Sequence, residues 1–292
     1  MFESLILIIL GGCMSEQGKL YLVGTPIGNL SDISPRALEV LGSVDFIAAE
    51  DTRVTLKLLS RFNIKKALIS CREHNIRQKS AEIAERLMNG ESCAVVTDAG
   101  MPCISDPGEE LVSECAERGI EVIVIPGPSA LIAALSVSGL PTERFSFEGF
   151  LSINKRSRAE RLNEVKDSRA TLIFYEAPHK LIYTLKDLLA ALGNRKIAVC
   201  RELTKIHEEV KRGKIADLLA FYETEKPRGE FVLVVEGKTL EKLPEISISD
   251  AVESAMKLLE KGTGTSEMAK QIARQTGHKK SEIYKLINEV RK

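Results

Sequence analysis

Several charged side chains stand directly after short apolar runs, where they could act as general acids or bases. The candidates for a general base are Glu50, Asp51, His74, Glu202 and Lys205. A positioned base typically adds a factor of roughly 10² to 10⁴ to a reaction rate. The alternative is structural: one carboxylate of the pair Glu50 and Asp51 would stabilise the first turn of a helix that Thr52 caps, and His74 would be an ordinary surface residue. The sequence does not choose among these candidates.

The turns that follow the apolar runs are rich in Gly and Pro, and the richest reads TDAGMPCISDPG over residues 97–108. Gly lets a ligand approach the main chain and Pro fixes φ, so this composition predicts a rigid concave wall. Asp98 and Asp106 could bond an amino group or ribose hydroxyls, or could simply close Asx turns. The turn GTPIGNL at 24–30 lacks the Lys of a P-loop and the three-Gly spacing of a dinucleotide site, so neither NTP hydrolysis nor NAD binding is predicted.

Composition limits the class of protein. The chain has 292 residues, with 41 Lys plus Arg and 41 Asp plus Glu. The length suits two domains, and the charge balance requires that any nucleic acid be held by a local basic patch. The six cysteines include no CxxC pair and the four histidines are scattered. We therefore expect free thiols, a cytoplasmic protein and no metal site.

The first residues are unusual because residues 1–13 are apolar and end in LGGC, like a lipoprotein cleavage site. Against export, no Lys or Arg precedes the apolar run, Glu3 stands where positive charge belongs, and the run is too short to span a bilayer. Met14 offers an alternative start. We therefore expect residues 1–18 to be an extension, either disordered or a start-site artefact, and we expect no membrane partner.

Periodicity predicts an α/β protein, because short apolar runs alternate with stretches of helical period from Leu20 onward. A mostly parallel first half is predicted with strands at 20–24, 46–49, 67–70, 93–97 and 122–125. A mixed sheet is predicted with strands at 145–147, 171–175, 197–200, 208–211 and 230–235. Three short helical patterns follow Pro244. The last two, 266–275 and 279–290, fit either a helix-turn-helix unit or a helical cap on the second sheet.

Taken in order, the motifs resemble the tetrapyrrole methylase superfamily, and within it the branch that methylates ribosomal RNA. The resemblance runs from about residue 19 to 238 through GTPIGNL, AAEDTR, DAGMPCISDPG, PGPSA, SGLP, FEGFL, FYEAPH, RELTK and GEFVLVVEG. It implies two α/β domains, at 19–139 and 140–240, with a cofactor cleft between them and a small helical segment at 241–292. The tetrapyrrole-modifying branch usually has GxGPG where this chain has GTPIG, which favours an RNA substrate.

The resemblance also implies a reaction. It implies S-adenosylmethionine as cofactor, 2′-O-ribose methylation of a cytidine in the decoding region of 16S ribosomal RNA, and a homodimer. The acceptor would be the small-subunit RNA or the assembled small subunit. The residues carried over to the cofactor are Ile27, Asp98, Ala99, Gly100, Cys103, Ser129, Ala130, Glu176 and Leu203. Two rival functions stay open: C-methylation of a tetrapyrrole, and a non-catalytic RNA-binding module that uses the tail.

Three arginines are hypothesised to contact RNA phosphates, namely Arg53, Arg77 and Arg156. Arg156 belongs to the basic run Lys155-Arg156-Ser157-Arg158. A solvated helix face is the usual interpretation of such a run, but a place near the junction of two domains would also suit phosphate contacts.

Overall fold

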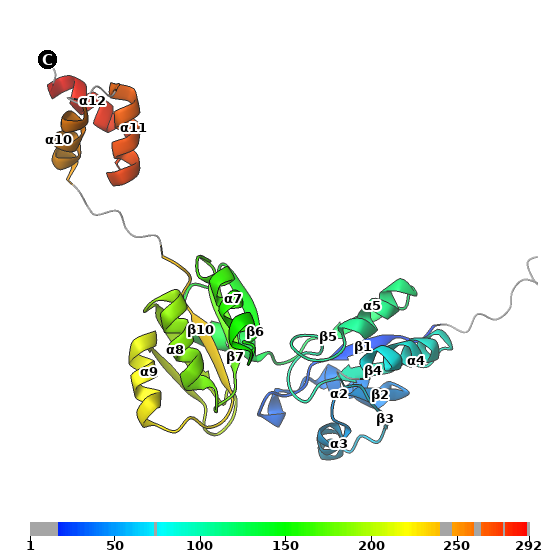
Figure 1. Ribbon diagram of the computed structural model, residues 1–292. Helices are drawn as coiled ribbons and strands as arrows, with labels where there is room; N and C mark the ends of the chain where they lie inside the picture. The colour runs from blue at the N-terminus through cyan, green and yellow to red at the C-terminus, as the bar shows by residue number, and fades with distance from the viewer. Residues whose placement is uncertain (1–16, 73–74, 240–246, 260–263, 277, 291–292) are drawn as a thin grey trace, which may run out of the picture. The chain divides into compact units, whose positions relative to one another are not determined.

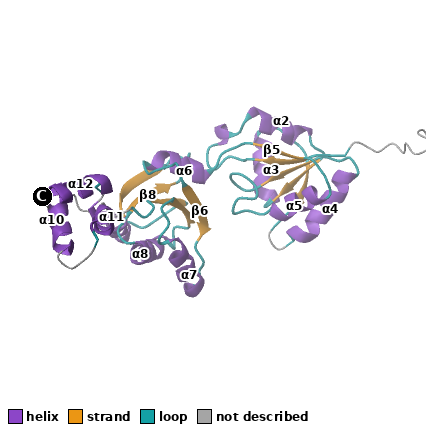
Figure 2. Cartoon of the chain, turned by 90° about the horizontal axis from the view of Figure 1, so that it is seen from above, coloured by secondary structure: helices purple, strands orange, loops and turns teal. Residues whose placement is uncertain are grey.

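The computed structural model describes residues 17–72, 75–239, 247–259, 264–276 and 278–290. The chain divides into two compact units, Met1–Lys238 and Thr239–Lys292. The first unit contains two five-stranded sheets with helices on both faces of each (Figures 1 and 2). The candidate base His74 and the N-terminal residues 1–16 lie outside the described residues.

The first sheet is parallel throughout and has the strand order β3-β2-β4-β1-β5. Its strands are β1 (Leu20–Val23), β2 (Phe46–Ala49), β3 (Ala67–Ser70), β4 (Cys93–Val96) and β5 (Val122–Ile125). Helices α2 (Pro35–Ser43) and α3 (Thr52–Arg61) cover one face, and α4 (Ile76–Met88) and α5 (Glu109–Glu117) cover the other. The central strands β2 and β4 are buried at every residue, as expected for a parallel sheet between two helix layers. All five predicted strands are present.

The second sheet is mixed, as predicted, with the order β6-β7-β10-β8-β9. Only β6 and β7 pair in parallel, and the other neighbours are antiparallel. The strands are β6 (Phe145–Phe150), β7 (Thr171–Glu176), β8 (Lys196–Arg201), β9 (Glu209–Lys214) and β10 (Phe231–Val235). Strand β6 extends beyond its predicted end because the chain continues past a bulge between Phe147 and Gly149, where Gly149 has a φ of 63°.

Helices cover the two faces of the second sheet unequally. One face carries α7 (Lys155–Val165), α8 (Leu181–Leu192) and α9 (Ile215–Thr224). The other carries α6 (Ala130–Ser138), whose buried Leu131, Ala134 and Leu135 pack against this sheet. The helix α6 directly follows β5 of the first sheet and lies within the segment 19–139 expected for the first domain. The turn before α6 therefore passes from one sheet to the other, which places the end of β5 beside the second sheet.

In its described residues, the second unit has three helices that bury their apolar faces against one another. These are α10 (Ile248–Leu259), α11 (Thr265–Thr276) and α12 (Lys280–Val290). Met268 and Ile272 of α11 meet Ile283 and Ile287 of α12 in its core. The two predicted helices at 266–275 and 279–290 are thus present. Among the described residues, every helix is too short or too polar to cross a bilayer.

Candidate functional site

A cavity of about 500 Å³ lies where turns of the two sheets meet. This size falls in the range of small-molecule sites, about 300–1,000 Å³. Most of the predicted site residues line it: Ile27, Glu50, Asp98, Ala99, Gly100, Ser129, Ala130, Glu176, Glu202, Leu203 and Lys205. Residues predicted from separate motifs, spread over 179 positions from Ile27 to Lys205, therefore face one space.

Glycines allow the turns after β1 and β5 to touch. A Cβ on Gly24 would lie 2.6 Å from the Cα of Gly127, and a Cβ on Gly127 would lie 2.7 Å from the Cα of Gly24. Neither position can therefore carry a side chain without moving a backbone. The turn after β4 joins them, because Thr25 and Gly100 exchange two backbone hydrogen bonds of 2.9 and 3.1 Å. These three turns form one wall of the cavity.

The long turn after β4 holds several residues in the left-handed region. Gly100 has a φ of 91°, and the non-glycine residues Cys103 and Ser105 have φ values of 69° and 64°. Such conformations cost a non-glycine residue roughly 1–3 kcal/mol each and concentrate at ligand sites. Cys103 itself does not line the cavity; a Cβ on Gly108 would lie 2.8 Å from its sulfur, so its side chain packs on that glycine.

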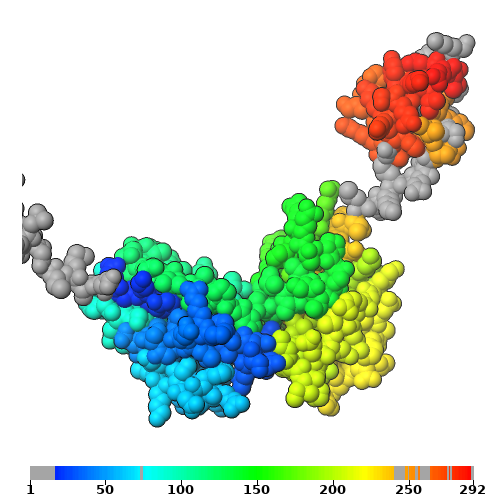
Figure 3. Space-filling model, turned by 180° about the vertical axis from the view of Figure 1, so that it is seen from behind, coloured from blue at the N-terminus to red at the C-terminus, as the bar shows by residue number. Residues whose placement is uncertain are grey.

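A turn of the second sheet closes onto the turn after β1. The backbone N–H of Asn29 donates to Oγ1 of Thr204 at 3.1 Å. A Cβ on Gly28 would lie 2.5 Å from the Cγ of Lys205, so the glycine permits the contact. In the space-filling view, the contact between the two turns appears where dark-blue atoms meet yellow-green atoms (Figure 3). The cavity is therefore walled by turns from both sheets.

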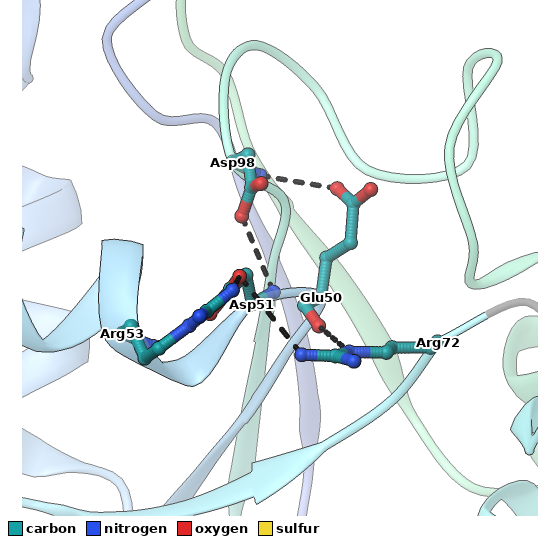
Figure 4. A network of polar contacts seen from close by, with 5 residues as sticks. All are labelled: Glu50, Asp51, Arg53, Arg72 and Asp98. Carbon is teal, nitrogen blue, oxygen red and sulfur yellow. Dashed lines mark hydrogen bonds and ion pairs between the residues drawn. The ribbon is translucent and has the colours of Figure 1, made fainter.

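Five charged residues form a network at the carboxyl ends of β2 and β4 (Figure 4). The backbone N–H of Asp98 donates to Oε2 of Glu50 at 3.2 Å, and that of Asp51 donates to Oδ1 of Asp98 at 3.2 Å. Arg72 donates from Nε to the backbone oxygen of Glu50 at 3.4 Å. These bonds fix the two carboxylates relative to each other.

Asp51 is occupied in a structural role. Its Oδ1 accepts from the backbone N–H of Arg53 at 2.9 Å, so Asp51, and not Thr52, caps α3. The Arg53 side chain also pairs with it at 2.5 Å. Hydrogen bonds from the side chain and the backbone of Arg53 hold the pKa of Asp51 well below its usual range. Asp51 does not line the cavity, and these contacts favour its structural interpretation.

Glu50, Asp98 and Asp106 together give the cavity an acidic wall. Burial raises the pKa of Glu50 and of Asp98. Burial, followed by the charges of Glu50 and Asp98, raises the pKa of Asp106 to about 6. An elevated pKa suits a general base that must accept a proton near neutral pH, and three neighbouring carboxylates suit a cationic ligand. Among the described residues, no group of three potential ligands is arranged to hold a metal ion.

Lys205 lies opposite, between two acids. Its Nζ donates to Oε1 of Glu202 and to Oε2 of Glu230, each at 2.9 Å. Burial alone would lower the pKa of Lys205, but the two hydrogen bonds outweigh it and the pKa is raised. Burial alone would raise the pKa of Glu202, but hydrogen bonds from the Glu230 backbone and from Lys205 outweigh burial and the pKa is lowered. Lys205 and Glu202 are therefore an ion pair, and Lys205 is better suited to carry charge than to accept a proton.

The cavity also contains residues that the motif analysis did not assign. Tyr175, at the end of β7, accepts a hydrogen bond at its hydroxyl from the backbone N–H of Leu131 at 3.2 Å. Its ring packs edge-on against Phe150, with centroids 5.6 Å apart. Both aromatics belong to the motifs FYEAPH and FEGFL, so the signal was present in the sequence.

The three predicted RNA-contacting arginines lie outside the cavity lining. Arg53 and Arg156 have side chains 80% and 88% exposed, and each pairs with a nearby acid, Asp51 and Glu160 respectively. Arg77 is exposed on α4. Their contact with RNA stays a prediction.

Comparison with known proteins places the chain in a family. The model for the Tetrapyrrole (Corrin/Porphyrin) Methylases matches residues 19–219. The chain belongs to this family. A Ribosomal RNA small subunit methyltransferase I from Synechocystis sp. is 47% identical over 274 residues, which cover 94% of this chain and 98% of the relative. The expected family, fold class and methyltransferase activity are confirmed.

Solved structures share the fold of this tetrapyrrole methylase. A diphthine synthase superposes with a TM-score of 0.61 at 18% identity, covering 77% of this chain and 92% of its own. A uroporphyrin-III C-methyltransferase from Thermus thermophilus, complexed with S-adenyl homocysteine, has a TM-score of 0.51 at 19% identity and covers 74% and 97%. At these identities the likeness concerns the fold.

Proposed function

We propose that this tetrapyrrole methylase transfers a methyl group from S-adenosylmethionine to the ribose 2′-hydroxyl of a cytidine in the decoding region of small-subunit ribosomal RNA. The observation that carries the proposal is the 47% identity, along almost the whole of both chains, to a methyltransferase named for that RNA. The alternative, C-methylation of a tetrapyrrole, rests on structures below 25% identity. The GTPIG turn also departs from that branch.

The cavity fits the cofactor in shape and chemistry. Gly100, with its φ of 91°, lines the cavity without a side chain and so allows a flat group to approach the main chain closely, and Ile27 and Leu203 offer apolar contacts. Asp98 is placed to accept from hydroxyl or amino groups, and the neighbouring carboxylates favour a positive charge. S-adenosylmethionine supplies a methyl group activated by attachment to a sulfonium. The residues present therefore suit it.

The protein's part in this chemistry is mainly alignment. In-line displacement needs the acceptor oxygen held within near-attack distance of the methyl carbon. Of the candidate carboxylate bases, Glu50 combines a place in the cavity with an elevated pKa. We therefore assign to Glu50 the role of the general base that accepts the proton of the acceptor hydroxyl. Lys205 and Glu202, already paired, are assigned to positioning. His74 stays a candidate outside the described residues.

The partners follow from the reaction. A ribosomal acceptor requires a cytoplasmic location, and the arginines Arg53, Arg77 and Arg156 remain candidates for phosphate contacts. The homodimer implied by the resemblance also remains a prediction. A non-catalytic RNA-binding module would not require a cofactor-sized cavity lined by family motifs from two sheets.

Ribose methylation of small-subunit RNA should be mapped in a strain lacking the gene, with and without the gene restored. The proposal expects one cytidine of the decoding region to lose its 2′-O-methyl group in the deletion strain and regain it on complementation. An unchanged methylation map would contradict the proposal. Transfer of label to uroporphyrinogen by the purified protein would support the alternative.

A further inference from the structure

A second and larger cavity, of about 900 Å³, forms a groove between α7 and α8 on the second sheet. Figures 1 and 2 both draw these helices side by side on the same face of that sheet. The α7–α8 groove has small and apolar residues along it, among them Ala159, Leu162 and Ala190. The residues that serve the cofactor cavity do not line it, so its composition requires a separate explanation.

The α7–α8 groove is positively charged. Lys155, Lys166 and Lys180 line it, together with Arg158. Its only lining carboxylate, Asp187, pairs with the buried Arg158 at 2.5 Å. Three lysine charges are thus left in excess. A local surplus of this kind attracts polyanions even when the whole chain has no net charge.

Acids elsewhere on the two helices do not neutralise the lysines. On α7, Glu160 pairs with Arg156 and Glu164 pairs with Arg161. Lys155 and Lys180 have no ion pair among the residues that the structure describes. The acids of α7 and α8 therefore leave these ammonium groups available to phosphates.

Two large exposed side chains accompany the lysines. Tyr183 is 70% exposed and Ile153 is 80% exposed, and both line the α7–α8 groove. An exposed aromatic ring beside cations is the combination that binds single-stranded nucleic acid, because bases stack on the ring while phosphates contact the charges. A protein ligand would need acidic side chains placed to match all three lysines, whereas an RNA strand carries a phosphate at every nucleotide.

The α7–α8 groove begins beside the cofactor cavity. Phe150, which lines the cavity, precedes Ile153 and Lys155 by only a few residues, and Pro178 of the cavity precedes Lys180 by two. A hydrogen-bond chain links the two sites as well. The Arg158 guanidinium donates to the Thr184 hydroxyl at 2.6 Å, and that hydroxyl donates to the cavity residue Glu176. An RNA strand with one ribose in the cavity could therefore continue into the groove.

We propose that the α7–α8 groove binds the single-stranded RNA segment that flanks the methylated nucleotide. Lys155, Lys166 and Lys180 contact its phosphates and Tyr183 stacks on one of its bases. This proposal rests on the proposed function for the identity of the acceptor. The binding surface itself is inferred from the lysines and the exposed tyrosine that line the groove.

The test compares charge reversal inside and outside the groove in the full chain. Lys155→Glu with Lys180→Glu is the groove variant, and Lys65→Glu with Lys214→Glu, at exposed sites elsewhere, is the matched control. Both change the net charge equally. We expect the groove variant to raise KM for small-subunit RNA at least tenfold relative to the control, with the Kd for S-adenosylmethionine unchanged. For the groove variant, a plot of the logarithm of RNA affinity against the logarithm of salt concentration should have a slope shallower by about one or more.

Tyr183→Ala tests stacking without a change of charge. Loss of one stacked base predicts about a 5- to 150-fold weaker binding of a fluorescent single-stranded oligoribonucleotide. Equal RNA affinity of the groove and control variants would overturn the proposal. A KM effect confined to assembled subunits, with naked RNA unaffected, would assign the groove to a ribosomal protein and also overturn it. Failure of the wild-type chain to methylate any ribosomal RNA would contradict the proposed function instead, and the oligoribonucleotide measurement would still report on the groove.

Discussion

The backbone N–H of Asn29 donates to the Oγ1 of Thr204 at 3.1 Å, although the two residues are 175 positions apart in the sequence. The bond joins the turn after β1 to the turn after β8. It lies beside Leu203 and Lys205, which line the cofactor cavity. The shape of that cavity therefore depends on close contact between turns of two different sheets.

Gly28→Ala should disturb this contact. The new Cβ would lie 2.5 Å from the Cγ of Lys205 and 3.0 Å from the backbone oxygen of Leu203. We expect S-adenosylmethionine to bind about tenfold more weakly, a loss of about 1.4 kcal/mol, as measured by calorimetry. Gly42→Ala is the control, since nothing lies within 4 Å of its Cβ and Ala favours a helix by roughly 0.5–1 kcal/mol. Identical affinities for the two variants would show that the turns tolerate a side chain.

Asp98→Asn should weaken the binding of S-adenosylmethionine more than the binding of its demethylated product, S-adenosylhomocysteine. Loss of a charge-assisted hydrogen bond costs about 1.5–3 kcal/mol, or roughly 10- to 150-fold in Kd. S-adenosylhomocysteine lacks the sulfonium charge, so its affinity should fall less. Calorimetry with both ligands measures the difference, and Asp32→Asn, at an exposed site, serves as control. A loss no greater than that of the control would remove Asp98 from the cofactor site.

Asp106 should make the fold less stable as the pH rises. Its pKa is about 6 in the folded chain and 3.8 for an ordinary aspartate, so the folded state binds this proton more tightly. The free energy of unfolding should therefore decrease between about pH 4 and pH 6 and then level off. Asp106→Asn removes the charge and should be more stable than wild type at pH 8 by on the order of 1–3 kcal/mol, with no advantage near pH 3. Urea unfolding across this range measures the difference, and an advantage independent of pH would contradict the assignment.

Glu50→Gln tests the general base while keeping the acceptor for the Asp98 backbone N–H. We expect kcat to fall by roughly 10² to 10⁴ and the acid limb of the pH–rate profile to disappear. In the wild type this limb should lie above the usual range of a glutamate, because burial raises the pKa of Glu50. Glu85→Gln, exposed on α4, should leave both the rate and the profile unchanged. A variant of Glu50 that kept its acid limb would shift the role to another group.

The sequence predicted the elements well because their signals are local. Apolar runs located most strands of the two sheets, although β9 (EVKRGK) is largely polar. Eleven of the predicted site residues likewise line the cavity, since polar and glycine-rich turns stood at strand ends. Asp51 and Thr52 mark the limit of such reasoning. Either side chain can cap a helix, and only the backbone geometry shows that Asp51 does so.

Properties that depend on long-range packing could not be predicted. The helix α6 follows the first sheet in the chain but buries Leu131, Ala134 and Leu135 against the second, and its uniformly apolar sequence fits either neighbour. The basic run at 155–158 was visible in the sequence, but the groove that Lys155 forms with Lys166 and Lys180 was not. The structure shows that the acids Glu160, Glu164 and Asp187 pair with arginines, so that Lys155 and Lys180 keep their charge without an ion pair among the described residues.

The most direct measurement incubates the purified full-length chain with S-adenosylmethionine labelled in its methyl group and with small-subunit RNA or assembled subunits, then digests the RNA to nucleosides. The account predicts label in 2′-O-methylcytidine from a single decoding-region position, and at least a hundredfold less label with Glu50→Gln. Label in a base-methylated nucleoside, or none in either acceptor, would contradict it.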